Sequence, residues 1–221
     1  MCVLICRVGD SPILAANRDE VYTRPFTAPR RWVAETPFWA PRDEDAGGTW
    51  LGVNAAGLVA AVTNRSLLPQ EPGRPSRGAL VAGVLARRSL DAARDWLDRE
   101  LRGPSPNPFQ LVAARRGRAF LCAGGPDGVE LAELRAGIHV LSNLHERGEL
   151  RLELPADVDA VRLQKTLADR TPRLPGDHAI CKVGSWRGTV AAAVIEPGRR
   201  FLFAAGPPGE VPFEAVASYP G

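Results

Sequence analysis

The chain has 221 residues, of which 45% are apolar and 24% are charged, and its formal net charge is +3. This length and composition are typical of a globular protein with a substantial buried core, and they exclude a fibrous or disordered chain. The arginines that make up most of the 28 basic residues are scattered among 25 acidic ones. Because no basic stripe carries interleaved aromatics, the sequence does not favour a nucleic-acid partner.

Four cysteines are present, but none forms a CxxC pair or has the spacing of zinc ligands, so no metal site is predicted. The sequence has neither a leader peptide nor an apolar stretch approaching 18 residues. We therefore expect a cytoplasmic protein with free thiols and no membrane span. Cys6, Cys122 and Cys181 lie in apolar runs and are expected in the core, whereas Cys2 directly follows the initiator methionine.

The first third of the chain has the pattern of β-structure. Residues 2–8 and 12–19 flank a Gly-Asp turn and predict a hairpin that ends in Asn-Arg-Asp-Glu. Residues 23–48 are rich in Pro, Arg and acidic residues and predict a long loop. A second hairpin is predicted at 49–64.

Helical periodicity begins at residue 79 and predicts two helices up to residue 101, with Ser89 as the N-cap of the second. A third helix is predicted to open at Asp157, and Gly198 to form a tight hairpin turn. The remaining predicted strands are 109–115, 119–124, 129–134, 139–143, 179–183, 189–197 and 200–206. This order lacks the strict alternation of a doubly wound fold, so we predict one antiparallel α+β domain over residues 1–221.

Cys2 becomes the first residue of the chain if the initiator methionine is removed, as it is before small residues. Its thiol and α-amine titrate near ~8.5 and ~8, so the amine can accept the thiol proton and activate the sulfur as a nucleophile. The alternative is an incidental small residue at the start of an edge strand.

The polar run of Asn17, Arg18 and Asp19 ends the second strand of the predicted hairpin. Because that hairpin is antiparallel, its register brings Arg18 or Asp19 next to Cys2. The charge of Arg18 is expected to lower the pKa of the thiol, and Asp19 is expected to orient the amine or the arginine. The alternative is a solvated turn in which these side chains cap backbone amides.

Asn64 and Asn143 each stand where an apolar strand stops. Such amides can donate to a developing oxyanion, or they can simply form turns. His145 follows two residues after Asn143 and is expected to be a surface residue.

The start MCVLICRV, the NRDE run, the stretch GGTWLGVNAAGLVAAVTNR and the later LSN together resemble the NRDE family, which is also called the transport and Golgi organisation family. That family is similar to N-terminal-nucleophile hydrolases, above all to the branch of penicillin V acylases and bile-salt hydrolases. The resemblance implies a four-layer αββα sandwich of two antiparallel sheets flanked by helices. It also implies hydrolysis of linear amides through the exposed cysteine.

The same resemblance implies catalytic roles for five residues. Cys2 would be the nucleophile and Arg18 would stabilise its thiolate. Asp19 would lie by the α-amine, Asn64 would donate to the oxyanion, and Asn143 would help to hold the substrate carbonyl or the amine.

Three further residues are candidates for substrate binding. Asn17 belongs to the same polar run, and Trp50 is one of three tryptophans at 32–50 that either line an aromatic mouth or pack beneath a loop. The related branch would have an arginine in the stretch VGSWRGT. Here Trp186 takes that place and Arg187 follows it, which on a strand is the opposite face.

The sequence therefore predicts an amidohydrolase-like protein that cleaves a small acyl amide (a non-peptide C–N bond) or a thioester through an acyl-enzyme, with no required cofactor. The alternative is a non-catalytic carrier or chaperone that binds haem or an acyl or lipid ligand in the same cleft, because likeness of fold alone does not transmit catalysis. The sequence carries no signal for an oligomeric state.

Overall fold

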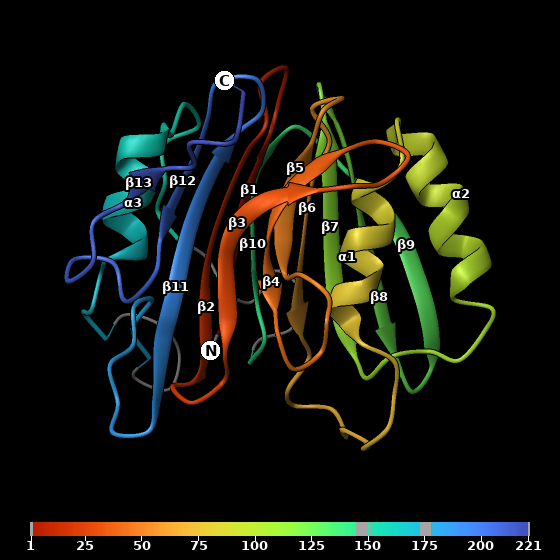
Figure 1. Cartoon of the computed structure of the whole chain (residues 1–221), viewed down its shortest axis with the longest axis horizontal. Helices are drawn as coiled ribbons and strands as arrows, with labels where there is room; N and C mark the ends of the chain where they lie inside the picture. The colour runs from red at the N-terminus through yellow and green to blue at the C-terminus, as the bar shows by residue number, and fades with distance from the viewer. Residues whose placement is uncertain (1, 145–149, 151, 173–177, 221) are drawn as a thin grey trace.

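The computed structural model describes residues 2–144, 150, 152–172 and 178–220, in which two β-sheets face each other (Figure 1). The first sheet has the order β10-β1-β2-β11-β12-β13. Its strands are β1 (Val3–Val8), β2 (Ile13–Val21), β10 (Gly137–Ser142), β11 (Arg187–Glu196), β12 (Arg200–Ala204) and β13 (Glu214–Ala215).

The second sheet has the order β3-β4-β5-β6-β7-β8-β9. Its strands are β3 (Phe26–Trp32), β4 (Phe38–Asp43), β5 (Leu51–Asn54), β6 (Val59–Asn64), β7 (Phe109–Arg115), β8 (Arg118–Gly125) and β9 (Gly128–Leu134). Every pairing of named strands within the two sheets is antiparallel.

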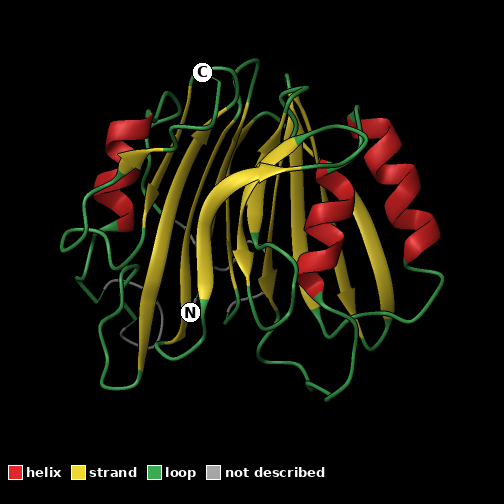
Figure 2. Cartoon of the chain, viewed as in Figure 1, coloured by secondary structure: helices red, strands yellow, loops and turns green. Residues whose placement is uncertain are grey.

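Helices cover the outer face of each sheet. Helix α3 (Ala160–Leu167) packs on β2 and β11, while α1 (Arg77–Leu85) and α2 (Leu90–Glu100) cover the second sheet, as Figure 2 shows. None of the helices in the described part of the chain is long and apolar enough to cross a membrane. The predicted α+β, four-layer αββα sandwich is confirmed.

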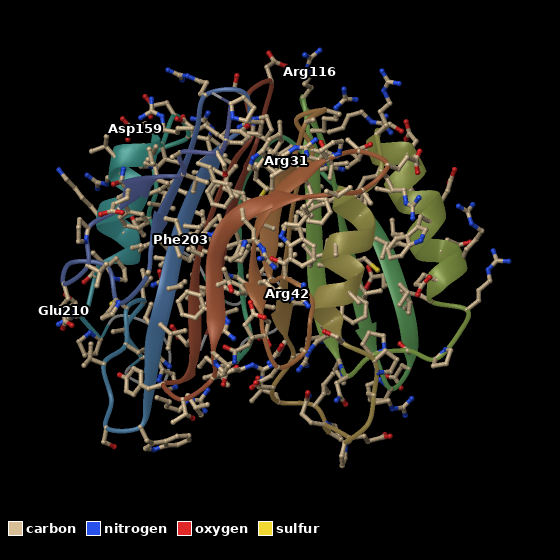
Figure 3. All side chains as sticks on the ribbon, viewed as in Figure 1. Arg31, Arg42, Arg116, Asp159, Phe203 and Glu210 are labelled. Atoms are coloured by element: carbon tan, nitrogen blue, oxygen red, sulfur yellow. The ribbon has the colours of Figure 1, made fainter. Side chains whose placement is uncertain are left out.

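Three apolar layers hold these elements together. Alternation along β1 sends Leu4 and Cys6 into the layer between the sheets and Val3 and Ile5 towards α3. Phe203, labelled in Figure 3, belongs to the layer between the sheets. Because both faces of β1 and β2 are covered, β1 is apolar apart from Arg7, and β2 is apolar up to Ala16, after which its polar run begins.

The prediction of a long loop at residues 23–48 was wrong, because β3 and β4 lie there. Strand β3 is an edge strand, most of its residues keep some exposure, and its pairing with β4 shifts between Thr27 and Arg30, around Pro29. An edge position tolerates both proline and charge, so composition concealed the strand.

Two further predictions needed correction. Residues 179–183 form no strand and connect α3 to β11 as a loop, in which the Cys181 amide donates to the Asp169 carbonyl (2.9 Å). Helix α3 begins at Ala160, where the side chain of its N-cap Asp159 accepts from an amide of the first turn, and not at Asp157. The predicted N-cap Ser89 and the turn at Gly198, with φ of +72°, are confirmed.

Candidate active site

Cys2 lies just before β1, which pairs with β2 on one side and β10 on the other. The registers align Val3 with Asn17 and with Ser142, so one residue further Cys2 stands beside Arg18 and beside the end of β10. The Asp19 amide donates to the Cys2 sulfur (3.4 Å), and the thiol in turn lies 3.6 Å from the Asp19 carbonyl oxygen. The adjacency predicted from the hairpin is confirmed.

A pocket of about 230 Å³ opens beside Cys2, where the ends of β2, β4 and β6 meet the first turn of α1. Five residues singled out from the sequence line it together: Cys2, Arg18, Asp19, Trp50 and Asn64. The pocket therefore brings the thiol, one guanidinium and one strand-end amide to a common space.

Arg18 is buried at the base of this pocket and is contacted from several sides. Its side chain is 7% exposed, and its Nη2 donates to Asp43 Oδ2 at 2.7 Å. Its guanidinium carbon lies 4.6 Å from the ring centroid of Trp50 and 5.6 Å from that of Phe26, which are cation–π distances. Its Nη1 is buried without a hydrogen-bond partner among the residues that the structure describes.

Asp43 accepts hydrogen bonds from two arginines and one backbone amide. Besides Arg18, it accepts from Arg24 Nε (2.9 Å), Arg24 Nη2 (3.2 Å) and the Ala46 amide (2.9 Å). Burial raises the pKa of the Asp43 carboxyl, but the bonds from Arg24 and Ala46 and the positive charges outweigh it, so the pKa lies below its usual value. Asp43 is thus an anion at neutral pH and compensates the charge of Arg18.

The thiol of Cys2 has a raised pKa, first because of burial and then because of the negative charge of Asp19. This corrects the expectation that Arg18 lowers it. The physical reason is the ion pair of Arg18 with Asp43, which offsets the positive charge that the thiolate would otherwise experience. Arg18 fixes the shape of the pocket floor instead.

Asp19 turns away from Arg18. Its Oδ1 accepts from Thr189 Oγ1 at 2.7 Å, and the Thr189 hydroxyl accepts from the Lys182 amide at 2.9 Å. These two hydrogen bonds connect the end of β2 to β11 and to the loop that precedes β11. The role of Asp19 beside an α-amine stays a prediction.

The two strand-end asparagines occupy different positions. Asn64 lines the pocket, and its side-chain amide has no hydrogen-bond partner within the described part of the chain. Asn143 is not among the lining residues; its Nδ2 donates to Ser66 Oγ (2.9 Å) and its backbone amide to the Cys2 carbonyl (3.4 Å). Asn64 is therefore available to a ligand, while Asn143 positions the backbone of Cys2.

Asn17 and Arg187 are not brought to the pocket. Asn17 is buried on the opposite face of β2, where its Nδ2 donates to the carbonyls of Leu167 (2.9 Å) and Ile180 (3.0 Å). Arg187 is exposed at the start of β11, with its guanidinium over the ring of Trp186. Asn17 misses the pocket because side chains alternate along β2, so it faces the side opposite to Arg18. Arg187 misses the pocket because it is the exposed first residue of β11.

Sequence reasoning missed four charged residues of the pocket: Arg24, Asp43, Arg74 and Arg77. Asp43 could have been found, because it ends the apolar strand β4 in the same way that the polar run ends β2. His145 lies outside the described residues. No cluster of three or more His, Cys, Asp or Glu that could hold a metal is present in the described ranges.

The other cysteines differ from Cys2 as predicted. Cys6, Cys122 and Cys181 are buried, and burial raises the pKa of Cys6 and of Cys122 to about 12. The thiols of Cys6 and Cys122 are therefore protonated at neutral pH, and Cys2 alone among the four has an exposed fraction above that of the core.

The chain folds as an αββα sandwich, and its second residue is a cysteine that lines a pocket. This is the architecture of N-terminal-nucleophile hydrolases. Solved structures of that class share the fold. Penicillin V acylase from Agrobacterium tumefaciens has a TM-score of 0.53 and 13% identity, and the match covers 92% of this chain and 83% of that one. Conjugated bile acid hydrolase from Clostridium perfringens has a TM-score of 0.58 and 11% identity, and the match covers 99% of this chain and 93% of that one. The Caenorhabditis elegans N-acylethanolamine-hydrolyzing acid amidase ortholog shares the fold too, with a TM-score of 0.60 and 13% identity over 89% of this chain and 93% of that one.

The sequence family is narrower than this class. The family described as Transport and Golgi organisation 2 matches residues 1–153, and the chain belongs to it. The mouse Transport and Golgi organization 2 homolog is 29% identical over 211 residues, covering 81% of this chain and 76% of the relative. The human homolog is 32% identical over 162 residues, covering 65% and 57%. The resemblance inferred from the motifs is confirmed.

Proposed function

We propose that this protein is an acyl-transfer hydrolase that uses Cys2 to cleave a small acyl amide or thioester. The observation that carries the proposal is the position of the Cys2 sulfur in a pocket shared with Arg18 and the unengaged amide of Asn64. The proposal draws its class from the structural relatives, whose printed names are those of acylases, hydrolases and an amidase.

The reaction would proceed through an acyl-enzyme. Removal of Met1 gives Cys2 a free α-amine, which accepts the thiol proton as the sulfur attacks the substrate carbonyl. Asn64 donates a hydrogen bond to the tetrahedral oxyanion. Collapse breaks the C–N or C–S bond, and the leaving amine or thiol takes the proton. Water then attacks the thioester, which releases a carboxylic acid and restores the thiol.

A carrier that holds an acyl ligand without cleaving it is the second candidate. The raised pKa of the Cys2 thiol and the compensation of Arg18 by Asp43 favour it, since both keep the sulfur in its unreactive form. Haem fits the pocket poorly: about 230 Å³ is below the ~300–1,000 Å³ usual for sites that enclose a ligand. Among the described lining residues, Cys2 is also the lone side chain of the kinds that bind haem iron.

Intact-mass analysis after incubation with p-nitrophenyl octanoate tests the enzyme against the carrier. We expect one octanoyl adduct that forms and then decays, that is lost in Cys2→Ala and that persists in Cys6→Ala. Cys6 is the matched control because it lies on the same face of β1 but is buried. Absence of a Cys2-dependent adduct would support the carrier. The cytoplasmic location stays a prediction, which fractionation of native cells would test.

A further inference from the structure

We infer that the pocket binds an anionic group of its ligand, a carboxylate or a phosphate, through Arg77, Arg24 and the first turn of α1. The identification of the ligand as an acyl substrate rests on the proposed function. The anion site itself rests on separate residues and contacts.

Arg77 is the first of these contacts. It is the first residue of α1, it lines the pocket, and its Nη1 donates to two neutral acceptors, Gln70 Oε1 (2.9 Å) and the Pro108 carbonyl (3.1 Å). Within the described part of the chain, no carboxylate lies at ion-pair distance from it. A partly buried guanidinium that is positioned by neutral groups keeps its charge for another partner.

Arg24 lines the same pocket and is close enough to repel Arg77. Burial, followed by the charge of Arg24, lowers the pKa of Arg77, and the charges of Cys2 and Glu20 oppose this only in part. Both arginines line the pocket, so two like charges lie near each other there. Two like charges at this distance repel each other, and an anion bound between the two guanidinium groups would make their arrangement favourable.

The first turn of α1 adds backbone donors to this position. The N-cap Ser76 makes no side-chain cap, and no acidic residue occupies the first turn, so the positive end of the helix is not compensated. A Cβ at Gly48 would lie 2.4 Å from the backbone carbon of Gly78, and one at Gly78 would lie 2.9 Å from the Thr49 amide. This glycine contact allows the helix end to reach the pocket wall.

Arg77 is the one arginine of the pocket lining without an ion-pair partner among the described residues. Of the other three, Arg18 pairs with Asp43, Arg24 with Asp43 and Glu20, and Arg74 with Glu71. The three lining carboxylates are already engaged: Asp19 by Thr189, Glu20 by the Val21 amide and Arg24, and Asp43 by Arg18, Arg24 and the Ala46 amide. In addition, Arg18 Nη1 is buried without an acceptor among the described residues. This unpartnered donor, independent of the helix end, is a further group that could donate to an anion or another acceptor of a ligand.

The ligand class follows from the two halves of the pocket. A carbonyl placed at Cys2 and Asn64 leaves the anionic group at Arg24 and Arg77. The predicted substrate is therefore an acyl amide or thioester that carries a carboxylate or phosphate, and neutral amides of the same length should bind less tightly.

Binding to the full-length Cys2→Ala variant, measured by tryptophan fluorescence and calorimetry, tests this inference without turnover. The probes are two matched pairs: N-octanoylglycine with N-octanoylglycinamide, and N-octanoyl-O-phosphoethanolamine with N-octanoylethanolamine. We expect the anionic member of at least one pair to bind about tenfold more tightly, as one charge-assisted contact provides. The pair with the larger preference identifies the anion, and that preference should shrink as salt increases.

Substitutions at Arg77 identify the site. Arg77→Gln should remove most of the preference, and Arg77→Lys should keep part of it. Arg102→Gln, at an exposed ion pair with Asp98 just beyond the end of α2, should keep it all. Thermal melts establish that each variant is folded. Equal binding within both pairs, no measurable binding of either anionic probe, or an unchanged preference in Arg77→Gln would overturn the inference. Anion preference without acylation of Cys2 would reject only the proposed function, and acylation without preference would reject only the anion site.

Discussion

Replacing Asp43 by asparagine tests the charge compensation at the pocket floor. The wild-type carboxylate accepts from Arg18, Arg24 and the Ala46 amide, and its side chain is 13% exposed against 7% for that of Arg18. Asp43→Asn keeps the shape but leaves the buried charge of Arg18 without a counter-charge. Breaking a buried pair in this way costs about 3–5 kcal/mol, and we expect the lower end because the Trp50 ring still stabilises the guanidinium.

This loss should appear as a decrease of roughly 6–12 °C in melting temperature for a chain of this size. The pKa of Asp43 is lowered in the folded state, so its stabilisation is complete above the ordinary Asp pKa of about 3.9 and is lost as pH falls through the folded-state pKa. Urea titrations of wild type and Asp43→Asn should therefore differ most near neutral pH and converge in acid.

The same substitution should make Cys2 more reactive while it makes the fold less stable. With Arg18 no longer compensated, the pKa of the thiol should fall, and alkylation by iodoacetamide at neutral pH should accelerate roughly three- to tenfold. Asp98→Asn, at an exposed ion pair with Arg102, is the control and should change neither quantity. A loss under 1 kcal/mol together with an unchanged alkylation rate would refute the assigned role of Asp43.

Four further changes separate the chemistry from the scaffold. Asn64→Ala should slow acylation about 100-fold with an unchanged melting temperature, because its amide has no partner among the described residues; an unchanged rate removes it from the mechanism. Asn17→Ala should cost about 1–3 kcal/mol in urea titration without affecting acylation, since it satisfies two buried carbonyls. Gly48→Ala should cost about 1–3 kcal/mol and weaken binding of the anionic probes, as it displaces the end of α1; unchanged affinity contradicts that contact. Protein that retains Met1 should acylate at Cys2 more slowly than protein cut before that cysteine, whereas identical pH–rate profiles would exclude the α-amine as base.

The fold could be predicted because its central strands, such as β1 and β2, are covered on both sides. Continuous apolar runs such as Ile13–Ala16 cannot lie at a surface, and their order along the chain excludes a doubly wound sheet. The location of the site followed from one hairpin, since antiparallel register alone places Cys2 next to Arg18. The edge strand β3 was missed because its exposed positions impose no apolar pattern.

The partners of the site residues could not be predicted, because they depend on contacts between the two sheets. Arg18 and Asp43 are 25 residues apart and belong to different sheets, so no local spacing relates them. Arg77 has the appearance of an ordinary surface residue at the start of a helix until the pocket is seen to open beside it. Burial and long-range charge, which reversed the expected pKa direction of Cys2, likewise exist only in the folded protein.

Arg18 and Arg77 affect the reactivity of Cys2 in different ways. The charge of Arg18 is offset by Asp43, so it contributes little to ionisation of the Cys2 thiol. Under the proposed function the activating base is then the α-amine of Cys2 itself, and reactivity depends on removal of Met1. Arg77, the first residue of α1, has no described carboxylate at ion-pair distance. A bound anion there would orient its acyl group towards the sulfur and would reduce the repulsion between Arg77 and Arg24, so binding and alignment of the substrate would be coupled through the same charge.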